Sequence, residues 1–314
     1  MRAAILEDTE HGPAPGEFEE PRAERDGQVV VDVSVAGVNP VDIWMAKGLM
    51  GSPPPLPSVA GREGIGTTED GRRVYLDSPV PPFGSFAERT LVEEETLIDV
   101  PDGVEDQVAV AFGIAGLAAW LGLGWRGGLS EGESVLVLGA SGTVGMIGVQ
   151  AAKLMGAGTV VAAARNEERL ERAKELGADA TVTIGDDPEA LAGAFRDAAP
   201  NDGFDLVLDP LWGAPALAAI QALALNGRAV LIGNSAGQEI ELSSRAVRSN
   251  QASLLGHTNF NASVEVKDEA FQAMCRHSAA GELHVEVEEL PLDEVEQAWE
   301  RQQNAPHRKL VLRP

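Results

Sequence analysis

A glycine-rich stretch carries the clearest chemistry in this chain. The apolar run VLVL at residues 135–138 leads into GASGTVG, and a helix-forming run follows to residue 155. A strand that ends in a glycine turn and opens a helix presents backbone N–H groups to a phosphate. Gly142 and Gly145 match the last two glycines of the G-x-G-x-x-G pattern, and Ala140 replaces the first. The stretch predicts a pyrophosphate cradle made of Ala140, Gly142, Thr143, Val144 and Gly145. A tight turn without a ligand is the alternative.

The residues after the next predicted strand indicate which dinucleotide would bind. The run TVVAAA at residues 159–164 ends where NAD-binding proteins usually carry an acidic residue for the ribose hydroxyl. Here Arg165 follows the strand, and Arg169 lies one helical turn further on. A missing acid and two added bases favour a 2′-phosphate, and therefore NADPH over NADH. For Arg165 alone, a solvated surface arginine is the competing interpretation.

Composition limits the partners that the chain can have. The 314 residues include 49 acidic and 24 basic ones, which gives a net charge of −25. Nucleic acids and anionic membranes are polyanions, so this charge argues against both as partners. A surface that is strongly acidic and poor in lysine is expected of a protein from a salt-adapted cytoplasm. The single cysteine, Cys275, leaves no disulfide framework and no cysteine-rich zinc site.

One segment approaches the length of a membrane span. Residues 108–125 contain no charged residue but include four glycines, which break the run. We interpret the segment as two short buried helices that meet between two domains. The first residues, MRAAILEDTEHG, read as a strand and a turn instead of a signal peptide. The expected location is the cytoplasm.

The pattern along the chain predicts an α/β protein with two domains. Residues 1–115 are rich in strand-forming runs, such as QVVVDVSV from residue 28. Residues 116–254 alternate continuously apolar strands with helices, which indicates a doubly wound parallel sheet covered on both faces. Its expected strands are VLVLG, TVVAAA, ATVTI, DLVLD, RAVLIG and SLLGHT, with helices expected at 167–176, 188–198 and 214–225 among others. Residues 255–314, which end in HRKLVLRP, are expected to return to the first domain.

Several local patterns occur together and in order. They are GVNPVDIWMAKG at 37–48, AGREGIG at 60–66, the glycine-rich turn, and GNSAG at 233–237. Together they resemble the medium-chain dehydrogenase/reductase superfamily, and within it the zinc-independent quinone oxidoreductase branch that includes zeta-crystallin. The resemblance implies a GroES-like β-rich catalytic domain joined to a Rossmann domain. Zinc-dependent members carry a cysteine at Asn39 and a histidine at Arg62, so we expect no metal here.

The resemblance also implies which residues line the active site. Asn39, Asp42 and Trp44 fall in the segment that borders the substrate cleft in the family. The Asn39 amide could hydrogen-bond an acceptor oxygen as charge develops there, or it could only shape an Asn-Pro turn. Asp42 is favoured as a helix N-cap over a catalytic acid, and Trp44 as an aromatic wall. Asn234 and Ser235 are expected beside the nicotinamide half of the cofactor.

The implied activity is hydride transfer from NADPH to a quinone without zinc. The nearest alternative is an enone, alkenal or enoyl-thioester reductase on the same fold. A non-catalytic NADPH-binding redox sensor is the alternative from another class. The small-molecule partner is therefore a quinone or another conjugated carbonyl. The family also implies a homodimer that pairs SLLGHT edge to edge across two subunits.

Overall fold

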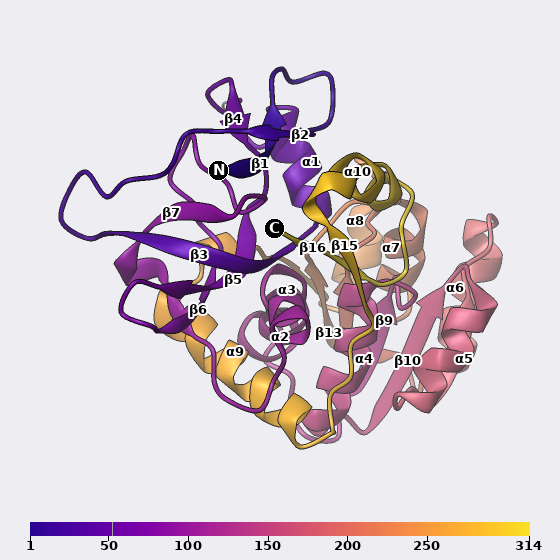
Figure 1. Cartoon of the computed structure of the whole chain (residues 1–314). Helices are drawn as coiled ribbons and strands as arrows, with labels where there is room; N and C mark the ends of the chain where they lie inside the picture. Colours follow the sequence, from indigo (N-terminus) through magenta and orange to yellow (C-terminus); the bar gives the residue numbers. More distant parts are fainter. Residues whose placement is uncertain (52) are drawn as a thin grey trace. The chain divides into compact units, whose positions relative to one another are not determined.

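The computed structural model describes residues 1–51 and 53–314, and these divide into two compact units. One unit comprises Met1–Ala115 together with Ser263–Pro314. The other comprises Gly116–Ala262. Each unit has its own β-sheet structure and its own buried residues (Figure 1).

The unit Gly116–Ala262 is built on a six-stranded sheet in which every strand pair is parallel. The strand order is β11-β10-β9-β12-β13-β14, the order of a doubly wound dinucleotide-binding fold. The expected α/β class with a Rossmann sheet is thus confirmed. The strands are β9 (Ser134–Leu138), β10 (Thr159–Ala164), β11 (Ala180–Thr183), β12 (Phe204–Asp209), β13 (Leu223–Leu231) and β14 (Ser253–Gly256).

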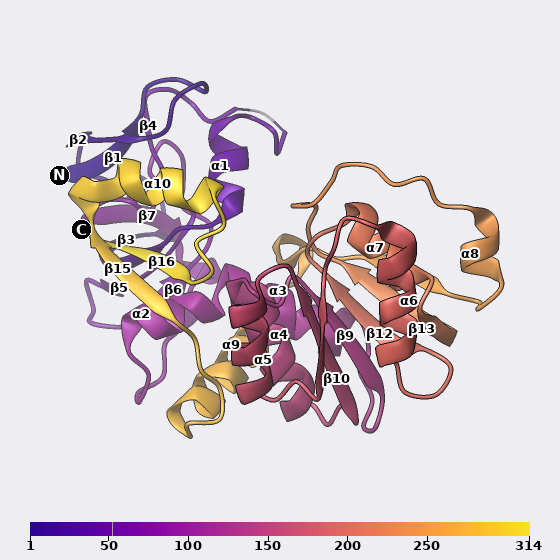
Figure 2. The ribbon, with the colours of Figure 1, turned by 90° about the vertical axis from the view of Figure 1, so that its right-hand side faces the viewer.

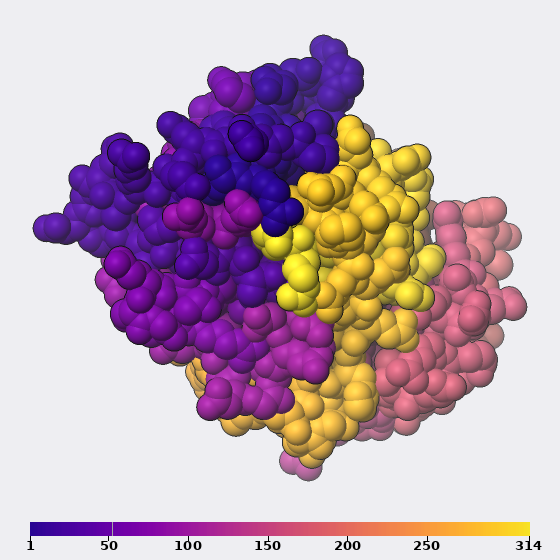
Figure 3. Space-filling model, in the orientation of Figure 1, coloured from indigo at the N-terminus to yellow at the C-terminus, as the bar shows by residue number. Residues whose placement is uncertain are grey.

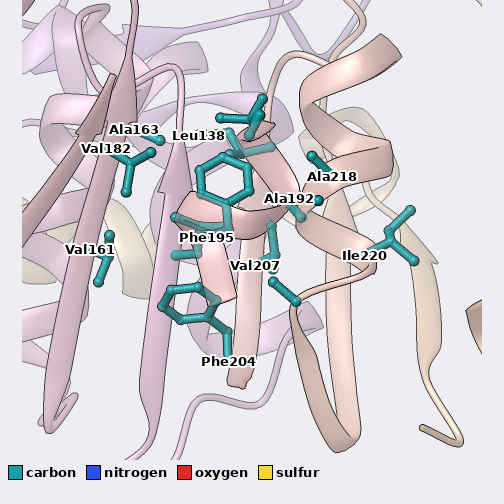
Figure 4. Packing of buried hydrophobic residues seen from close by; sticks show 14 of the residues in the cluster. Leu138, Val161, Ala163, Val182, Ala192, Phe195, Phe204, Val207, Ala218 and Ile220 are labelled. Carbon is teal, nitrogen blue, oxygen red and sulfur yellow. The ribbon is translucent and has the colours of Figure 1, made fainter. Parts of the chain in front are cut away.

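Helices connect these strands and cover the sheet. They are α3 (Ile114–Leu121, which begins in the first unit), α4 (Thr143–Leu154), α5 (Glu167–Glu175), α6 (Pro188–Ala198), α7 (Gly213–Ile220) and α8 (Ser244–Arg248). A Cβ on Gly148 of α4 would meet Val137 and Leu208, so α4 packs closely on one face of the sheet. Helices α6 and α7 pack on the other face, where Phe195 and Ala218 join Leu138 and Val161 in one cluster (Figure 4). Burial of both faces explains why the strands are continuously apolar.

One predicted helix is too long. The sequence favours a helix over residues 214–225, but α7 ends at Ile220 and β13 begins at Leu223. Leu223 pairs with Phe204 of β12, and a Cβ on Gly227 would lie 2.7 Å from the Phe204 carbonyl oxygen. Pairing with a buried neighbouring strand therefore overrides the helix propensity of this alanine- and leucine-rich run.

The other unit contains two sheets. A seven-stranded sheet runs β15-β16-β3-β5-β6-β8, with β7 also paired to β3, and a small sheet runs β2-β1-β4. The strands are β1 (Arg2–Leu6), β2 (Ala14–Glu17), β3 (Gln28–Gly37), β4 (Ser58–Val59), β5 (Glu63–Thr68), β6 (Arg73–Leu76), β7 (Arg89–Glu93), β8 (Ile98–Asp99), β15 (Val287–Pro291) and β16 (Lys309–Arg313). The helices are α1 (Pro40–Ala46), α2 (Asp106–Ala109), α9 (Val264–Ala279) and α10 (Val295–Gln303).

Residues Ser263–Pro314 complete this β-rich unit. Strand β16 pairs antiparallel with β3 and parallel with β15, so it lies inside the larger sheet. Helix α10 packs on β15 and β16 and beside α1, as Figure 2 shows. In the space-filling view the yellow C-terminal residues lie directly against the indigo N-terminal ones (Figure 3). The start of the chain and its last described strand therefore share one core, which includes Leu6, Ile43, Trp299 and Leu310.

The apolar segment around residue 115 is broken in the structure. Helices over Asp106–Phe112 and Ile114–Arg126 meet at a bend of 43°. Among residues 1–51 and 53–314, no single helix has the length and apolar composition of a membrane span, although this bent pair passes such a test when its two parts are combined.

Candidate active site

Helix α1 begins with a capped turn that fixes two of the predicted site residues. Asn39 is the N-cap, with extended backbone angles, and Pro40 takes the first helical position, where its missing N–H costs nothing. Asp42 lies three residues beyond the cap, and its Oδ2 accepts a hydrogen bond from the Asn39 backbone N–H at 2.7 Å. The expectation that Asp42 is the N-cap is therefore corrected, because Asn39 holds that position and Asp42 supports it.

The side-chain amide of Asn39 is fully engaged inside the unit. Its Nδ2 donates to Glu63 Oε1 at 2.8 Å and to the Gly37 carbonyl at 3.2 Å. Its Oδ1 accepts from Lys309 Nζ at 2.6 Å. Both donors of the amide are used, and the residue is 3% exposed. This geometry does not offer a free N–H to a substrate oxygen; it favours the interpretation in which Asn39 shapes the turn.

Glu63 is the centre of the buried polar network around Asn39. Its Oε1 accepts from Lys309 Nζ at 2.6 Å, and its Oε2 accepts from the Tyr75 hydroxyl at 3.1 Å and the Ile114 backbone N–H at 2.6 Å. Burial, followed by the negative charge of Glu63, raises the pKa of Tyr75 well above its ordinary value. Both carboxylate oxygens of Glu63 therefore have hydrogen-bond donors inside the unit.

Close approach in this network depends on glycine. A Cβ on Gly37 would lie 2.9 Å from the Lys309 side chain, and one on Gly113 would lie 2.5 Å from the Tyr75 hydroxyl. The sequence analysis did not single out Glu63, Lys309 or Tyr75. A lysine in the apolar run KLVLR was the available signal, because a lysine is rarely buried without a partner.

The residues around Asn39 do not fit a zinc ion. Zinc needs thiolate, imidazole or carboxylate ligands in a tetrahedral array. In the described parts of the chain, no group of three or more His, Cys, Asp or Glu side chains is placed to hold a metal. The ammonium of Lys309 already lies against Asn39 and Glu63, and this positive charge would repel a divalent ion. The donor set at this position therefore suits an ammonium group and not a metal.

Asp42 is a buried acid beside a small cavity. The cavity has a volume of about 90 Å³ and is lined by Asp42, Met45, Ser58, Arg62 and several prolines of the neighbouring loops. Burial, only partly offset by the Asn39 N–H, raises the pKa of Asp42 from 3.8 to about 7. Its Oδ1 and the Ser58 hydroxyl have no hydrogen-bond partner among the described residues. Trp44 lies half-buried on the same helix.

The glycine-rich turn in the other unit has the form of a phosphate cradle. Gly139, directly after β9, adopts a φ of +63°, and the Gly142 N–H donates back to its carbonyl at 3.1 Å. A Cβ on Gly145 would lie 2.6 Å from the Ala140 Cα, so the start of α4 packs tightly on the turn. A Cβ on Gly142 would have no atom nearer than 3.8 Å, which leaves its outer side open. Thr143 and Val144 are half-buried at the first turn of α4.

Gly139 is the turn residue that sequence reasoning passed over. Ala140 was assigned to the first glycine position, but it is buried, and its N–H donates to the Ala163 carbonyl at 3.0 Å. The left-handed backbone that a tight strand–helix turn needs occurs one residue earlier, at Gly139. The spacing Gly139, Gly142 and Gly145, a glycine every third residue, was the signal.

The two arginines lie at the carboxyl edge of β10, as their sequence positions require. Arg165 follows the strand directly, and its side chain is 73% exposed, with Asp186 at 3.7 Å. Asn166 caps α5 by accepting from the Arg169 N–H at 3.0 Å, which places Arg169 in the first turn of that helix, half-buried. Both arginines therefore project from one strand–helix connection next to the glycine-rich turn, because β10 pairs with β9.

Asn234 and Ser235 lie at the carboxyl edge of β13. The Ser235 hydroxyl donates to the Pro210 carbonyl at 3.3 Å, and Asn234 Nδ2 donates to Gln238 at 2.8 Å. The Asn234 Oδ1 is buried without a partner among the described residues, as is Oδ2 of the neighbouring Asp209. Burial raises the pKa of Asp209 to about 6. Unsatisfied buried acceptors at one sheet edge suit a ligand that brings hydrogen-bond donors, such as a carboxamide.

Comparison with known proteins agrees with this architecture. A family model for the alcohol dehydrogenase GroES-like domain matches residues 25–102, and one for zinc-binding dehydrogenases matches residues 143–277. The chain is similar to human quinone oxidoreductase, with 26% identity over 292 residues, covering 88% of this chain and 85% of that protein. It is similar to a tomato 2-methylene-furan-3-one reductase, with 34% identity over 176 residues, covering 50% of this chain and 45% of that protein.

A solved structure extends the likeness over the whole chain. The quinone oxidoreductase of Thermus thermophilus, which is also known as a complex with NADPH, matches with a TM-score of 0.84 and 30% identity, covering 100% of both chains. The fold is that of a two-domain oxidoreductase with a GroES-like domain and a Rossmann domain. The chain belongs to the medium-chain dehydrogenase/reductase family, in its quinone oxidoreductase branch.

Proposed function

We propose that this protein is an NADPH-dependent oxidoreductase that transfers a hydride to a quinone without a metal. The observation that carries the proposal is the carboxyl edge of the parallel sheet, where an open glycine turn and two arginines follow adjacent strands. The quinone oxidoreductases among its relatives support the acceptor class. In this proposal the N–H groups around Gly142 hold the pyrophosphate, and Arg165 and Arg169 hold the 2′-phosphate.

The bound NADPH supplies the hydride, and the protein supplies binding and orientation. The cradle is shaped by Ala140, Thr143, Val144 and Gly145. Asn234 and Ser235 form hydrogen bonds with the nicotinamide half of the cofactor in this proposal. Asn39 acts as a positioning residue because its amide is used within the unit, and it fixes the start of the helix that carries Asp42 and Trp44. Trp44 provides an aromatic wall for a planar acceptor in this proposal.

The proton balance favours a quinone. Hydride addition to a quinone gives the hydroquinone anion, which takes one proton from water to form the neutral hydroquinone. The anion is stable enough for solvent to deliver this proton, so the reaction needs no protein acid at the acceptor. An enone differs, because hydride addition gives an enolate that must be protonated at carbon. The tomato furanone reductase among the relatives keeps this second reaction class as the alternative.

The test is oxidation of NADPH and of NADH with benzoquinone, phenanthrenequinone and an alkenal, at low and at molar salt. Turnover of a quinone with NADPH, and at least about tenfold less with NADH, is the expected result. Turnover of the alkenal alone would move the protein to the enone reductases. Tight NADPH binding with no turnover of any acceptor would favour a redox sensor and would overturn the proposed activity.

We also propose that two copies pair through β14. This strand ends the six-stranded sheet, so one of its edges, along Ser253–Gly256, is not paired in the sheet. An unpaired edge is a template for pairing with another strand, and a second copy would satisfy it. Sedimentation velocity tests the proposal, with a proline substitution at Leu254 expected to give monomers. A monomeric wild-type protein in molar salt would contradict it.

A further inference from the structure

Trp212 has a backbone conformation that side chains rarely adopt. It lies between β12 and α7 with φ of 55° and ψ of −160°. This region of backbone space is essentially restricted to glycine, because any Cβ collides with the flanking peptide groups. The next residue, also at positive φ (+66°), is Gly213. The connection therefore needs two consecutive positive-φ residues, and the chain supplies glycine at only one of them.

The surrounding structure holds Trp212 in this conformation. Oδ1 of the buried Asp209 accepts from the Leu211 N–H at 2.8 Å and from the Trp212 N–H at 2.9 Å. The Leu211 carbonyl accepts from the Ala236 N–H at 2.7 Å. A Cβ on Gly213 would lie 2.8 Å from the Ala236 carbonyl oxygen, so the chain cannot relax on that side. The backbone is fixed on both sides of an unfavourable residue.

Core packing does not explain why the residue is tryptophan. The hydrophobic cluster on the α6–α7 face of the sheet includes Leu211 among the side chains packed against it, but Trp212 is not one of them. Trp212 is half-buried. Glycine would serve the backbone better, and a large aromatic ring that lies outside the cluster does little for the core. A strained residue of this kind points to a function for its side chain.

The position of Trp212 in the sheet indicates which residues lie beside its segment. Strand β12 lies between β9 and β13, so the segment after β12 lies between their two connections. On one side, Leu211 and Pro210 lie about 3.1 Å from where a Cβ of Gly139 would be, in the glycine-rich turn. On the other side, the Ser235 hydroxyl donates to the Pro210 carbonyl at 3.3 Å. The segment that contains Trp212 therefore lies at the carboxyl edge of the sheet, between the two groups of residues proposed to hold the dinucleotide.

We propose that Trp212 is a cofactor-contact residue whose indole forms a wall of the dinucleotide site between the pyrophosphate cradle and Asn234. The inference rests on the proposed function, since it assumes that a nicotinamide dinucleotide binds this edge. The chemistry is stacking or edge contact of a flat aromatic ring with the ribose or nicotinamide ring, which buries apolar surface on both. Asp209 is the positioning residue, because its carboxylate fixes the strained backbone.

The experiment measures NADPH binding by isothermal titration calorimetry and thermal unfolding of the ligand-free protein. Wild type comes first, because failure of wild type to bind NADPH or NADH would refute the proposed function separately from the role of Trp212. The variants are W212G, W212L and W212F, with W125F as the control. Trp125 is 53% exposed in the same unit and follows α3.

The expected results separate binding from folding. W212G relieves the backbone strain, so its unfolding midpoint rises by about 2–4 °C, while its Kd for NADPH rises about tenfold or more. W212L keeps the strain and the bulk but loses the ring, and its Kd rises about as much. W212F keeps an aromatic ring, so its Kd for NADPH stays within about threefold of the wild-type value. W125F changes neither quantity.

Unchanged affinity in the variants would overturn the inference. If W212G and W212L bind NADPH within about twofold of wild type, the indole does not contact the cofactor. If W212G unfolds at a much lower temperature, the ring has a structural role that outweighs the strain, and the W212L affinity then decides alone. Energy transfer from tryptophan to bound NADPH provides a readout independent of affinity and should fall more in W212F than in W125F.

Discussion

The ammonium of Lys309 lies 2.6 Å from the carboxylate of Glu63, and both side chains are almost completely buried. The same nitrogen donates to Asn39 Oδ1, and the same carboxylate accepts from Tyr75 and from the Ile114 N–H. The ammonium of Lys309 and both carboxylate oxygens of Glu63 therefore have hydrogen-bond partners. Such partners offset the cost of removing a buried ion pair from water. The pair thus fixes the residues from which α1 starts.

Removing Lys309 should strongly destabilise the β-rich unit. K309M leaves the Glu63 carboxylate buried without its cation, and breaking a buried pair in this way costs about 3–5 kcal/mol. Arg313 lies on the same strand as Lys309 and forms an exposed ion pair with Glu289. R313M removes this pair and should lower the free energy of unfolding by less than about 1 kcal/mol. Urea unfolding of both variants is the measurement. Equal losses of unfolding free energy in K309M and R313M would show that burial of the Lys309–Glu63 pair does not increase its contribution to stability.

Asp42 should make the protein less stable as the pH rises. Its pKa is about 7 in the folded chain and 3.8 as the ordinary value, so the folded state binds the extra proton between these limits. Stability from this group is full below about pH 4 and is lost as the pH rises towards 7. The charged groups around the carboxyl are Glu63, Lys309 and Arg62.

D42N removes this titration and keeps an oxygen for the Asn39 N–H. Relative to wild type, the free energy of unfolding of D42N should be about 1–4 kcal/mol higher at about pH 8 and unchanged at about pH 4. Urea midpoints at the two pH values provide the measurement, with D32N on the exposed side of β3 as the control. A gain that does not depend on pH would exclude a buried, titrating Asp42 as the cause.

The glycines of the turn should separate folding from cofactor binding. G145A places a methyl group 2.6 Å from the Ala140 Cα and should cost about 1–3 kcal/mol of unfolding free energy. G142A has open space around its Cβ and negative φ, so its stability should change little. Its NADPH affinity should fall about tenfold because the methyl group blocks close approach of the pyrophosphate. Calorimetric titration and urea unfolding of both variants test the contrast; unchanged affinity in G142A would argue against phosphate at this turn.

Arg169 should set the preference for NADPH. R169A is expected to weaken NADPH binding about tenfold and leave NADH binding within about twofold, because only NADPH carries the 2′-phosphate. R172A, on the same helix, removes an ion pair to Glu175 and should leave both affinities unchanged. Ratios of the two Kd values measure the effect. A parallel loss for NADPH and NADH in R169A would assign the arginine to helix stability instead.

The net charge should make the assembly depend on salt. At −25 per chain, two copies repel one another unless ions screen the charge, and the screening length falls from about 30 Å at 0.01 M to about 3 Å at 1 M. Dimer content and thermal stability should therefore both rise with ionic strength. Sedimentation at low and at molar salt measures the first, and thermal unfolding measures the second. A dimer of constant strength at all salt concentrations would contradict the prediction.

The sequence was sufficient for the parallel sheet but not for the polar network. Runs such as TVVAAA are apolar throughout, and the predicted strand coincides with β10 because both faces of the sheet are covered. The helix at 188–198 was also predicted at its observed bounds, since Asp187 caps it and Pro188 starts it. The end of α7 was wrong because strand pairing at Leu223 depends on a partner distant in sequence.

The network around Glu63 joins residues that no local pattern relates. Asn39 and Lys309 lie 270 positions apart, and only the insertion of β16 beside β3 brings them together. For this reason the amide of Asn39 could be interpreted from sequence as a free donor. Trp212 was missed for a different reason: its backbone angles arise from the packing of three connections, and a tryptophan in a loop gives no sign of a strained φ.

The position of β16 also has a consequence for biosynthesis. The unit from Gly116 to Ala262 is continuous in sequence, so it can fold as soon as it leaves the ribosome. The β-rich unit cannot, because its central sheet stays open and Glu63 lacks its cation until Lys309 has been translated. Nascent chains should therefore hold a folded nucleotide-binding unit while residues 1–115 remain protease-sensitive and exposed to chaperones until β16 has been translated.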